Sequence, residues 1–215
     1  MIDLLLTMAL MDKFILQELS PIPPKPSISI SKKTDYLNIN ISWMDIRNIA
    51  IGEASIEDFF NISFGLPKKV LLPKGFKLYK LSDSILNYSE LEVETLISPW
   101  WTPYESFLDH PGYISNMSIA KANGISLREW VRVTCAVQEN WSSLKYLHIV
   151  TLEKPVYAWY GSTKSVRRLS SDSPSKRDGQ VEQSGRTKKL PGGSKQLYIP
   201  NLTNEYIDSY EYIEI

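Results

Sequence analysis

The sequence predicts one α+β domain with a substantial hydrophobic core. Hydrophobic residues make up 43% and aromatic residues 11% of the 215 residues, which is enough apolar side chain for a core of ordinary size. Short runs that alternate apolar and polar residues predict β-strands, and a capping box followed by an apolar face predicts an α-helix. The two patterns together indicate a domain built from both kinds of element.

The charge balance and the cysteine count exclude several classes of protein. Lysine plus arginine equals aspartate plus glutamate at 24 each, so no overall charge points to nucleic acid or to an anionic membrane. The single cysteine, Cys135, excludes an intrachain disulfide and a thiolate zinc cluster, and it suits a reducing compartment. With only His110 and His148, no histidine-rich metal centre and no metal cofactor are expected. Cys135 reads as a buried, inert thiol, and His148 as a packed strand histidine rather than a general base.

Residues 1–26 are predicted to be an N-terminal amphipathic helix and a proline-rich linker. The apolar stretch 1–16 is short and is interrupted by charged residues, which argues against a membrane span, and it lacks the features of a signal peptide. We expect it to dock on the domain or on a partner. The four prolines within 21–26 favour an extended linker.

Residues 27–72 are predicted to form an accessory hairpin and helix. Alternation in 27–31 and in 37–42, with a turn at 32–35, predicts two strands that share one buried face. Ser55-Ile-Glu-Asp58 predicts a helix start, with Phe59 and Phe60 packing inward.

Residues 73–215 are predicted to be the main domain. Strands are expected at 76–81, 146–152, 156–160 and 196–199, together with an extended segment at 98–103 that two prolines keep out of a helix. A helix over 115–123 should end at Gly124, and a second should begin at Ser126.

Three stretches of this domain are predicted to be short strands or strand ends that present polar and aromatic groups to a cleft. They are Gly75-Phe-Lys-Leu-Tyr-Lys80, Ile97-Ser-Pro-Trp-Trp101 and Pro191-Gly-Gly-Ser-Lys-Gln-Leu-Tyr-Ile-Pro-Asn-Leu202.

Residues 162–195 differ in composition from the rest of the domain. This stretch is rich in serine and glycine and carries nine basic and three acidic side chains, a net charge of +6. It is predicted to be a flexible basic loop that hangs between two adjacent strands, where it could close over the cleft as a lid.

The order of these motifs resembles the ADP-ribosyltransferase-like fold, in particular the toxin domains at the C-termini of bacterial secreted (polymorphic toxin) effectors. The order runs from Leu-Tyr-Lys through Ile-Ser-Pro-Trp-Trp and two helices to Val-Tyr-Ala-Trp-Tyr-Gly and Gly-Gly-x-x-Gln-Leu-Tyr-Ile-Pro. The resemblance covers about residues 73–208. It implies two small antiparallel sheets with flanking helices, and a cleft between the sheets that holds NAD as a substrate.

The resemblance also implies roles for the residues of the first two motifs. Tyr79 and Lys80 correspond to the cofactor-binding basic motif, with lysine where arginine is usual. Ser98 corresponds to the serine that supports the ribose region, and Trp100 or Trp101 would stack on the nicotinamide.

Gln196 falls where the third motif begins, and here the chain departs from the family pattern. The late strand reads Gln-Leu-Tyr, so the acidic residue expected two positions after Gln196 is missing. The implied catalytic pair is therefore Gln196 and Ser98, in which Gln196 orients the ribose but cannot act as a general base.

The function that the resemblance implies is that of an NAD-dependent mono-ADP-ribosyltransferase or NAD glycohydrolase acting as an effector toxin. Such a protein would be secreted, would work in the cytoplasm of a target cell on an acceptor macromolecule, and would meet a cognate immunity protein that plugs the cleft. Before export it would reside in the cytoplasm of the producing cell.

Two other classes of function stay open from the sequence. The aromatic residues of the three motifs also fit a packed core, which would leave a non-catalytic protein-interaction module. The basic loop 162–195 also fits a nucleic-acid-binding protein, because clustered lysine and arginine release counterions from a phosphate backbone.

Overall fold

The computed structural model describes residues 36–51, 54–85, 91–168 and 189–215. All of them belong to one compact unit, residues 34–215. The predicted N-terminal helix, the proline-rich linker, the first strand of the predicted hairpin and most of the basic loop lie outside the described residues.

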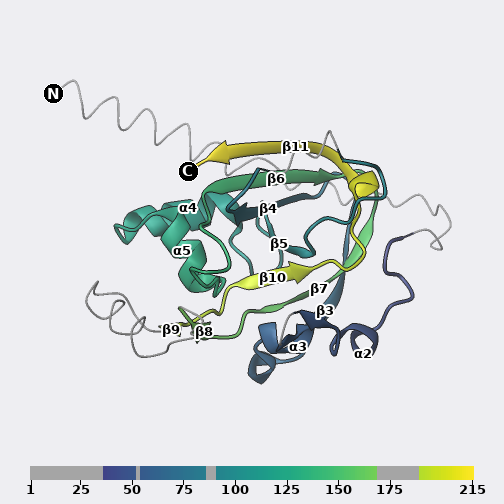
Figure 1. The fold of residues 1–215 in the computed structure, drawn as a ribbon, viewed down its shortest axis with the longest axis horizontal. Helices are drawn as coiled ribbons and strands as arrows, with labels where there is room; N and C mark the ends of the chain where they lie inside the picture. Colours follow the sequence, from purple (N-terminus) through teal and green to yellow (C-terminus); the bar gives the residue numbers. More distant parts are fainter. Residues whose placement is uncertain (1–35, 52–53, 86–90, 169–188) are drawn as a thin grey trace. The chain divides into compact units, whose positions relative to one another are not determined.

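The centre of this unit is a seven-stranded antiparallel sheet with the strand order β11-β6-β4-β5-β10-β7-β3 (Figure 1). The strands are β3 (Lys68–Leu72), β4 (Lys77–Ser82), β5 (Trp100–Pro103), β6 (Tyr146–Leu152), β7 (Val156–Ser162), β10 (Lys195–Tyr198) and β11 (Ile207–Glu214). Together with the helices described below, this sheet confirms the predicted α+β class.

Strand β5 joins the two halves of the sheet. Its first two residues pair with β10, through Trp101 with Leu197 and Trp100 with Tyr198, whereas Thr102 and Pro103 pair with β4. Strand β4 pairs with β6 from Lys77 to Ser82, but it pairs with β5 only at Leu78 and Tyr79. The last three residues of β4 therefore diverge from β5, and the sheet forks beyond Tyr79.

Four α-helices flank this sheet in the described residues. They are α2 (Trp43–Ile46), α3 (Ile56–Phe59), α4 (Gly112–Ala122) and α5 (Leu127–Thr134). Figure 1 shows α4 and α5 beside the half that contains β4 and β6, and α2 and α3 beside the half that contains β3 and β7. Each pair of helices covers its own cluster of buried side chains: Val131 and Cys135 pack with Tyr79 and Leu81, whereas Ile56 packs with Trp159.

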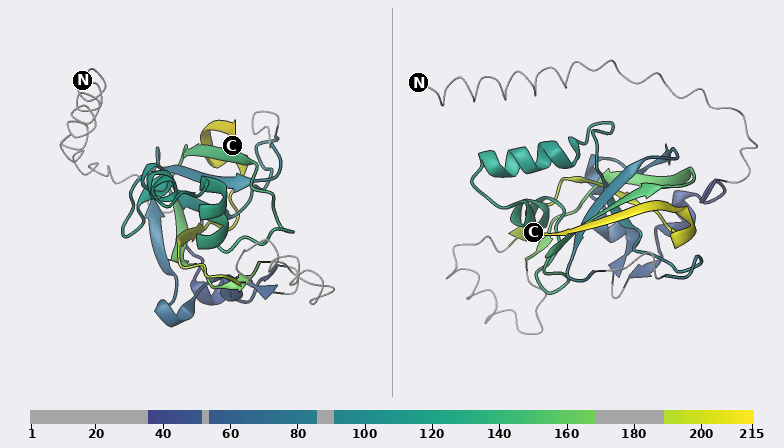
Figure 2. Two further views of the ribbon diagram at one scale, coloured as in Figure 1. Left: turned by 90° about the vertical axis from the view of Figure 1, so that its left-hand side faces the viewer. Right: turned by 90° about the horizontal axis from the view of Figure 1, so that it is seen from above.

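Short elements complete the unit. They are the hairpin β1 (Ala50–Ile51) and β2 (Ala54–Ser55), the pair β8 (Val166–Arg167) and β9 (Lys189–Leu190), and the 3₁₀ turns η2 (Ile62–Phe64) and η4 (Asn204–Tyr206). Figure 2 shows β11 running along β6 as the last strand of the sheet.

The helix signals at Ser55, 115–123 and Ser126 are confirmed. The Ser126 side chain accepts a hydrogen bond from the Glu129 amide at 3.1 Å and so caps α5. Helix α4 begins three residues earlier than predicted and is followed by Gly124 with a φ of 68°, which favours glycine at the end of a helix. The predicted helix start at Ser55 is also present, but of the two phenylalanines that follow it only Phe60 is buried.

The predicted strand over 37–42 is wrong. Leu37 makes one bridge to Val156, and the chain then turns at Asn38, whose φ is 64°. The Asn38 amide donates to the carbonyl oxygens of Tyr157 at 3.1 Å and Pro200 at 2.7 Å. An asparagine that adopts the left-handed conformation and satisfies two carbonyl groups ends a strand in spite of the alternating pattern.

Strand β3 links the predicted accessory region to the main sheet. It pairs with β7 along all five of its residues, from Lys68 with Tyr160 to Leu72 with Val156. The expected boundary between 72 and 73 therefore falls at the end of an edge strand of the sheet, inside the compact unit.

Candidate functional site

A cavity of about 1010 Å³ lies at the fork between β4 and β5. Its walls come from the end of β4, from β5, from the C-terminal end of α5 and the chain that follows it, from α3, and from residues 163–166. Ligand pockets commonly range from about 300 to 1000 Å³, so this one has room for a dinucleotide. The cavity brings residues of all three sequence motifs together: Lys80, Ser98 and Gln196 all line it.

Lys80 provides a partly buried positive charge in this cavity. Its ammonium nitrogen lies 5.0 Å from the centre of the Trp101 ring. Burial lowers the pKa of the Lys80 ammonium to about 8, while the negative charge of Asp83 opposes this shift. A cation that has lost much of its water is a strong binding site for an anion such as a phosphate, because the anion replaces the missing solvation.

We expect the burial of Lys80 to make the free energy of unfolding depend on pH. The lysine pKa is about 10.4 in an unfolded chain. Between about pH 8 and that value the unfolded chain binds more protons, so stability rises with pH. Below about pH 8 the charge is present in both states, and burying it costs about 3 kcal/mol.

Lys80→Met should therefore be more stable than the wild type at pH 7, and this difference should shrink as the pH approaches 10.5. Urea denaturation of both proteins at several pH values measures it. Lys77→Met is the matched control, because Lys77 lies on the same strand and is exposed. Equal stability of Lys80→Met and the wild type at every pH would contradict the account.

The second motif separates the two tryptophans. Trp100 lines the cavity, where it packs against Phe59 with ring centroids 5.5 Å apart. Trp101 is fully buried, at 0% exposure, and its indole N–H donates to the carbonyl oxygen of Ser98 at 2.6 Å. Trp101 thus cannot stack on a ligand as predicted. Instead, it holds Ser98 in place through this hydrogen bond, and the Lys80 ammonium lies over its ring.

Tyr79 is among the residues that line the cavity, but almost none of its side chain is accessible to a ligand. Its side chain is 1% exposed and belongs to the core under α5, where its hydroxyl accepts a hydrogen bond from Asn116 at 3.3 Å. Alternation along β4 sends Tyr79 and Lys80 to opposite faces of the strand, so the prediction for Lys80 does not extend to its neighbour.

Gln196 enters the cavity from β10. It pairs with Gly161 of the neighbouring strand β7. A Cβ atom on Gly161 would lie 2.7 Å from the buried ring of Phe60, so only glycine allows α3 to pack this closely behind Gln196. Tyr198, two residues after Gln196, is 5% exposed and packs against Trp100 with ring centroids 4.9 Å apart.

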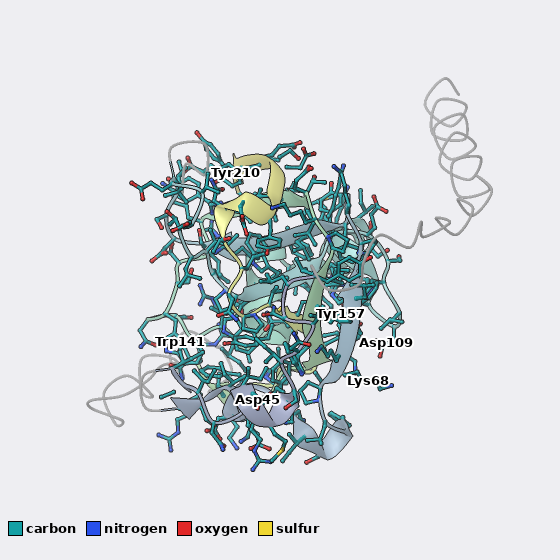
Figure 3. All side chains as sticks on the ribbon, turned by 90° about the vertical axis from the view of Figure 1, so that its right-hand side faces the viewer. Asp45, Lys68, Asp109, Trp141, Tyr157 and Tyr210 are labelled. Carbon is teal, nitrogen blue, oxygen red and sulfur yellow. The ribbon has the colours of Figure 1, made fainter. Side chains whose placement is uncertain are left out.

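The structure adds residues to the site that the sequence analysis missed. Trp141 is 47% exposed and lines the cavity beside Phe59, with ring centroids 5.9 Å apart. Figure 3 shows it at the edge of the molecule, on the side of the view away from Asp109 and Lys68. Together, Phe59, Trp100 and Trp141 form an aromatic wall on which a planar ring can stack.

Gln138 is a second site residue that the sequence analysis missed. It is 8% exposed and lines the cavity, and its side-chain oxygen is buried without a hydrogen-bond partner among the described residues. A buried acceptor of this kind is costly unless a donor completes it, so it suits a ligand that carries an N–H or O–H group. Gln138 follows α5 in an irregular segment, so no periodic pattern in the sequence pointed to it.

Several cations of the predicted basic loop are engaged with carboxylates. Arg168 is 2% exposed and bonds Glu129 and Glu139, with nitrogen–oxygen distances of 2.7 and 3.3 Å. Lys164 pairs with Asp58 at 3.7 Å, and Lys195 pairs with Asp109 at 3.4 Å. These pairs tie both ends of the loop to the domain and reduce the charge that its described part offers to a nucleic-acid backbone.

The described part of the chain contains no group of three or more His, Cys, Asp or Glu side chains arranged to hold a metal ion. Within the same residues, no helix has the length and hydropathy of a membrane span. Comparison with protein-family models, with curated proteins and with solved structures gave no match.

Proposed function

We propose that this protein cleaves the bond between nicotinamide and ribose in NAD, as a mono-ADP-ribosyltransferase or an NAD glycohydrolase. The observation that supports this proposal most strongly is that Lys80, Ser98 and Gln196 line one cavity, although they are far apart in the sequence. The three residues come from the three motifs on which the family resemblance rests.

The fork in the sheet supports the fold that this proposal requires. We interpret the seven-stranded sheet as two small antiparallel sheets, β11-β6-β4 and β10-β7-β3. Strand β5 joins them, and the cofactor binds between them. The divergence of β4 from β5 beyond Tyr79 gives a dinucleotide access to the groups at the fork. On this interpretation, the fork would be the NAD-binding cleft that the proposed fold requires.

Each residue then has a role that its chemistry allows. The Lys80 ammonium binds the pyrophosphate, and the aromatic wall of Phe59, Trp100 and Trp141 holds the nicotinamide ring. Ser98 and Gln196 hydrogen-bond the ribose and so support the positive charge that develops on it as the nicotinamide leaves as a neutral molecule. Fixing the substrate in this way lowers the barrier because the groups are already oriented for the transition state.

As an effector toxin, the protein would act in the cytoplasm of a target cell after secretion, on an acceptor macromolecule. Before export it would stay in the cytoplasm of the producing cell, where an immunity protein would fill the cavity and block access to NAD. A protein that plugs the cleft in this way would compete with NAD for Lys80 and for the aromatic wall.

Nicotinamide release from NAD tests the proposal. We expect the purified protein to release nicotinamide alone, if it is a glycohydrolase, or with added cell lysate, if it needs an acceptor. Gln196→Ala should lower the rate by about 100-fold, since it removes hydrogen bonds that strengthen in the transition state. Expression of the wild type should also be toxic to bacteria, and expression of Gln196→Ala should not.

The opposite result would rule out the proposed enzymatic function. No nicotinamide release with or without lysate, together with no heat of NAD binding in calorimetry, would leave a protein-interaction module or a nucleic-acid-binding protein. Variants of Lys80 and Gln196 would then keep their partner binding.

A further inference from the structure

Ser82 and His148 form a hydrogen bond at the wall of the cavity. The Ser82 hydroxyl lies 2.5 Å from Nε2 of His148, and Ser82 lines the cavity. His148 is 0% exposed, and its Nδ1 lies 2.7 Å from the Tyr210 hydroxyl. A hydroxyl group at the cavity is therefore connected through a buried imidazole to a phenol on β11.

The sheet register explains why these groups meet. Ser82 follows Lys80 by two residues on β4, so both side chains lie on the same face of the strand. His148 of β6 is the direct cross-strand partner of Lys80 and shares that face. Tyr210 reaches His148 from the next strand, with the two rings stacked at a centroid distance of 5.7 Å.

The hydrogen bonds of Ser82 allow a proton to pass between its hydroxyl and the imidazole of His148. Its hydroxyl also lies 2.7 Å from the carbonyl oxygen of Ser84, but a hydroxyl has only one hydrogen to donate. When Ser82 donates to Ser84, the imidazole carries its proton on Nε2. When Ser82 donates to His148, the proton of the imidazole is on Nδ1 and points to Tyr210. The second arrangement leaves the Ser82 oxygen ready to take a proton as it passes its own to the imidazole.

On the basis of the function proposed above, we propose that Ser82 and His148 are the proton acceptor for the nucleophile that attacks the ribose. As the bond between ribose C1′ and the nicotinamide nitrogen breaks, its electron pair neutralises the pyridinium ring. The oxygen of water, or of an acceptor hydroxyl, bonds to C1′ and releases its proton to the Ser82 oxygen. The Ser82 proton moves to Nε2 of His148, and Tyr210 holds the resulting imidazolium in position.

This assignment fills the place of the missing acidic residue. The amide of Gln196 cannot accept the proton. Of the carboxylates at the cavity, Asp58 pairs with Lys164 and accepts hydrogen bonds from Ser55. Asp83 is exposed to solvent, and it is the rival candidate that the experiment must separate.

The surroundings of His148 keep the imidazole neutral at pH 7, with one ring nitrogen unprotonated, and make it a weaker base than a free imidazole. Burial, together with the positive charge of Lys80, lowers the pKa of His148 to about 4. The groups that face it are Lys80 from β4, Tyr210 and Tyr212 from β11, and the carbonyl of Ser84.

Rescue of Ser82→Ala by azide tests the inference. Removing a general base should lower nicotinamide release by about 100-fold, with the KM for NAD unchanged. The residual rate should rise in proportion to hydroxide concentration, whereas the wild-type rate should stay flat near neutral pH. Azide needs no deprotonation, so it should restore nicotinamide release to Ser82→Ala and should not restore it to Lys80→Met. His148→Gln should behave like Ser82→Ala, and Asp83→Asn like the wild type.

The outcomes distinguish this inference from the proposed function. An active wild type with an unimpaired Ser82→Ala would overturn the inference alone. Loss of activity in Ser82→Ala without azide rescue would do so too, because it indicates a structural role. A fall in Asp83→Asn that azide restores would assign the base to Asp83 instead. A wild type that releases no nicotinamide would overturn the proposed function, and the inference with it.

Discussion

Lys80→Met should lower the affinity for NAD by about 100-fold, although the protein becomes more stable. A charge-assisted hydrogen bond to phosphate contributes about 1.5–3 kcal/mol, and the loss of this amount corresponds to a fall of 10- to 100-fold. The upper end is expected because the lysine is partly buried, so the phosphate replaces water that the ammonium has already lost. Calorimetric titration with NAD measures the affinity.

Lys80→Met should lower the affinity for NAD but raise the stability, so partial unfolding of the variant cannot produce the same result. A variant that binds less ligand because it is damaged would also be less stable. Lys77→Met, on the same strand but exposed, should change neither the affinity nor the stability appreciably. Equal NAD affinity in Lys80→Met and Lys77→Met would exclude Lys80 from the binding site.

Arg168→Met should lower the free energy of unfolding by about 3 kcal/mol, the largest loss of stability that we expect from removing one charge. The guanidinium is 2% exposed and makes two bonds to Glu129, at 2.7 and 3.3 Å, and one to Glu139 at 3.3 Å. Its removal leaves two partly buried carboxylates close together without their cation. The Glu139 amide also donates to the Arg168 carbonyl at 3.0 Å, so the side chain and the backbone hold the same contact.

The neighbouring residue provides the control for this variant. Arg167 is exposed, so Arg167→Met should change stability by less than about 0.5 kcal/mol. Adding Glu129→Gln to Arg168→Met should recover part of the loss, because it removes one of the two negative charges that faced the guanidinium. Urea denaturation measures all four proteins. Identical midpoints for Arg167→Met and Arg168→Met would contradict a structural role for the ion pairs.

Local patterns in the sequence predicted four strands of the seven-stranded sheet and three of the flanking helices, but not the edge strands β3 and β11. Alternation and β-rich composition predicted β4, β6, β7 and β10 to within two residues at each end, and the caps at Ser55 and Ser126 predicted α3 and α5. These signals depend on neighbouring residues alone. The prediction failed at 37–42, where the hydrogen bonds of Asn38 to residues more than a hundred positions away override the alternation.

The site was predictable only in part, because it too depends on contacts between residues that are far apart in the sequence. Lys80, Ser98 and Gln196 belong to motifs that were predicted to face one cleft, and the structure places all three residues at one cavity. Sequence alone could not separate Trp100 from Trp101, because which of them is buried depends on the faces that β4 and β10 present to β5. The bond between Ser82 and His148 depends on the register of β4 with β6, which no local pattern specifies.

The position of ADP-ribose in a crystal structure of the complex tests the central claim most directly. The account predicts that the ligand lies in the cavity at the fork between β4 and β5, with its pyrophosphate beside the Lys80 ammonium and its ribose within reach of Ser98 and Gln196. ADP-ribose bound to another surface, or an empty cavity at saturating ligand, would contradict it.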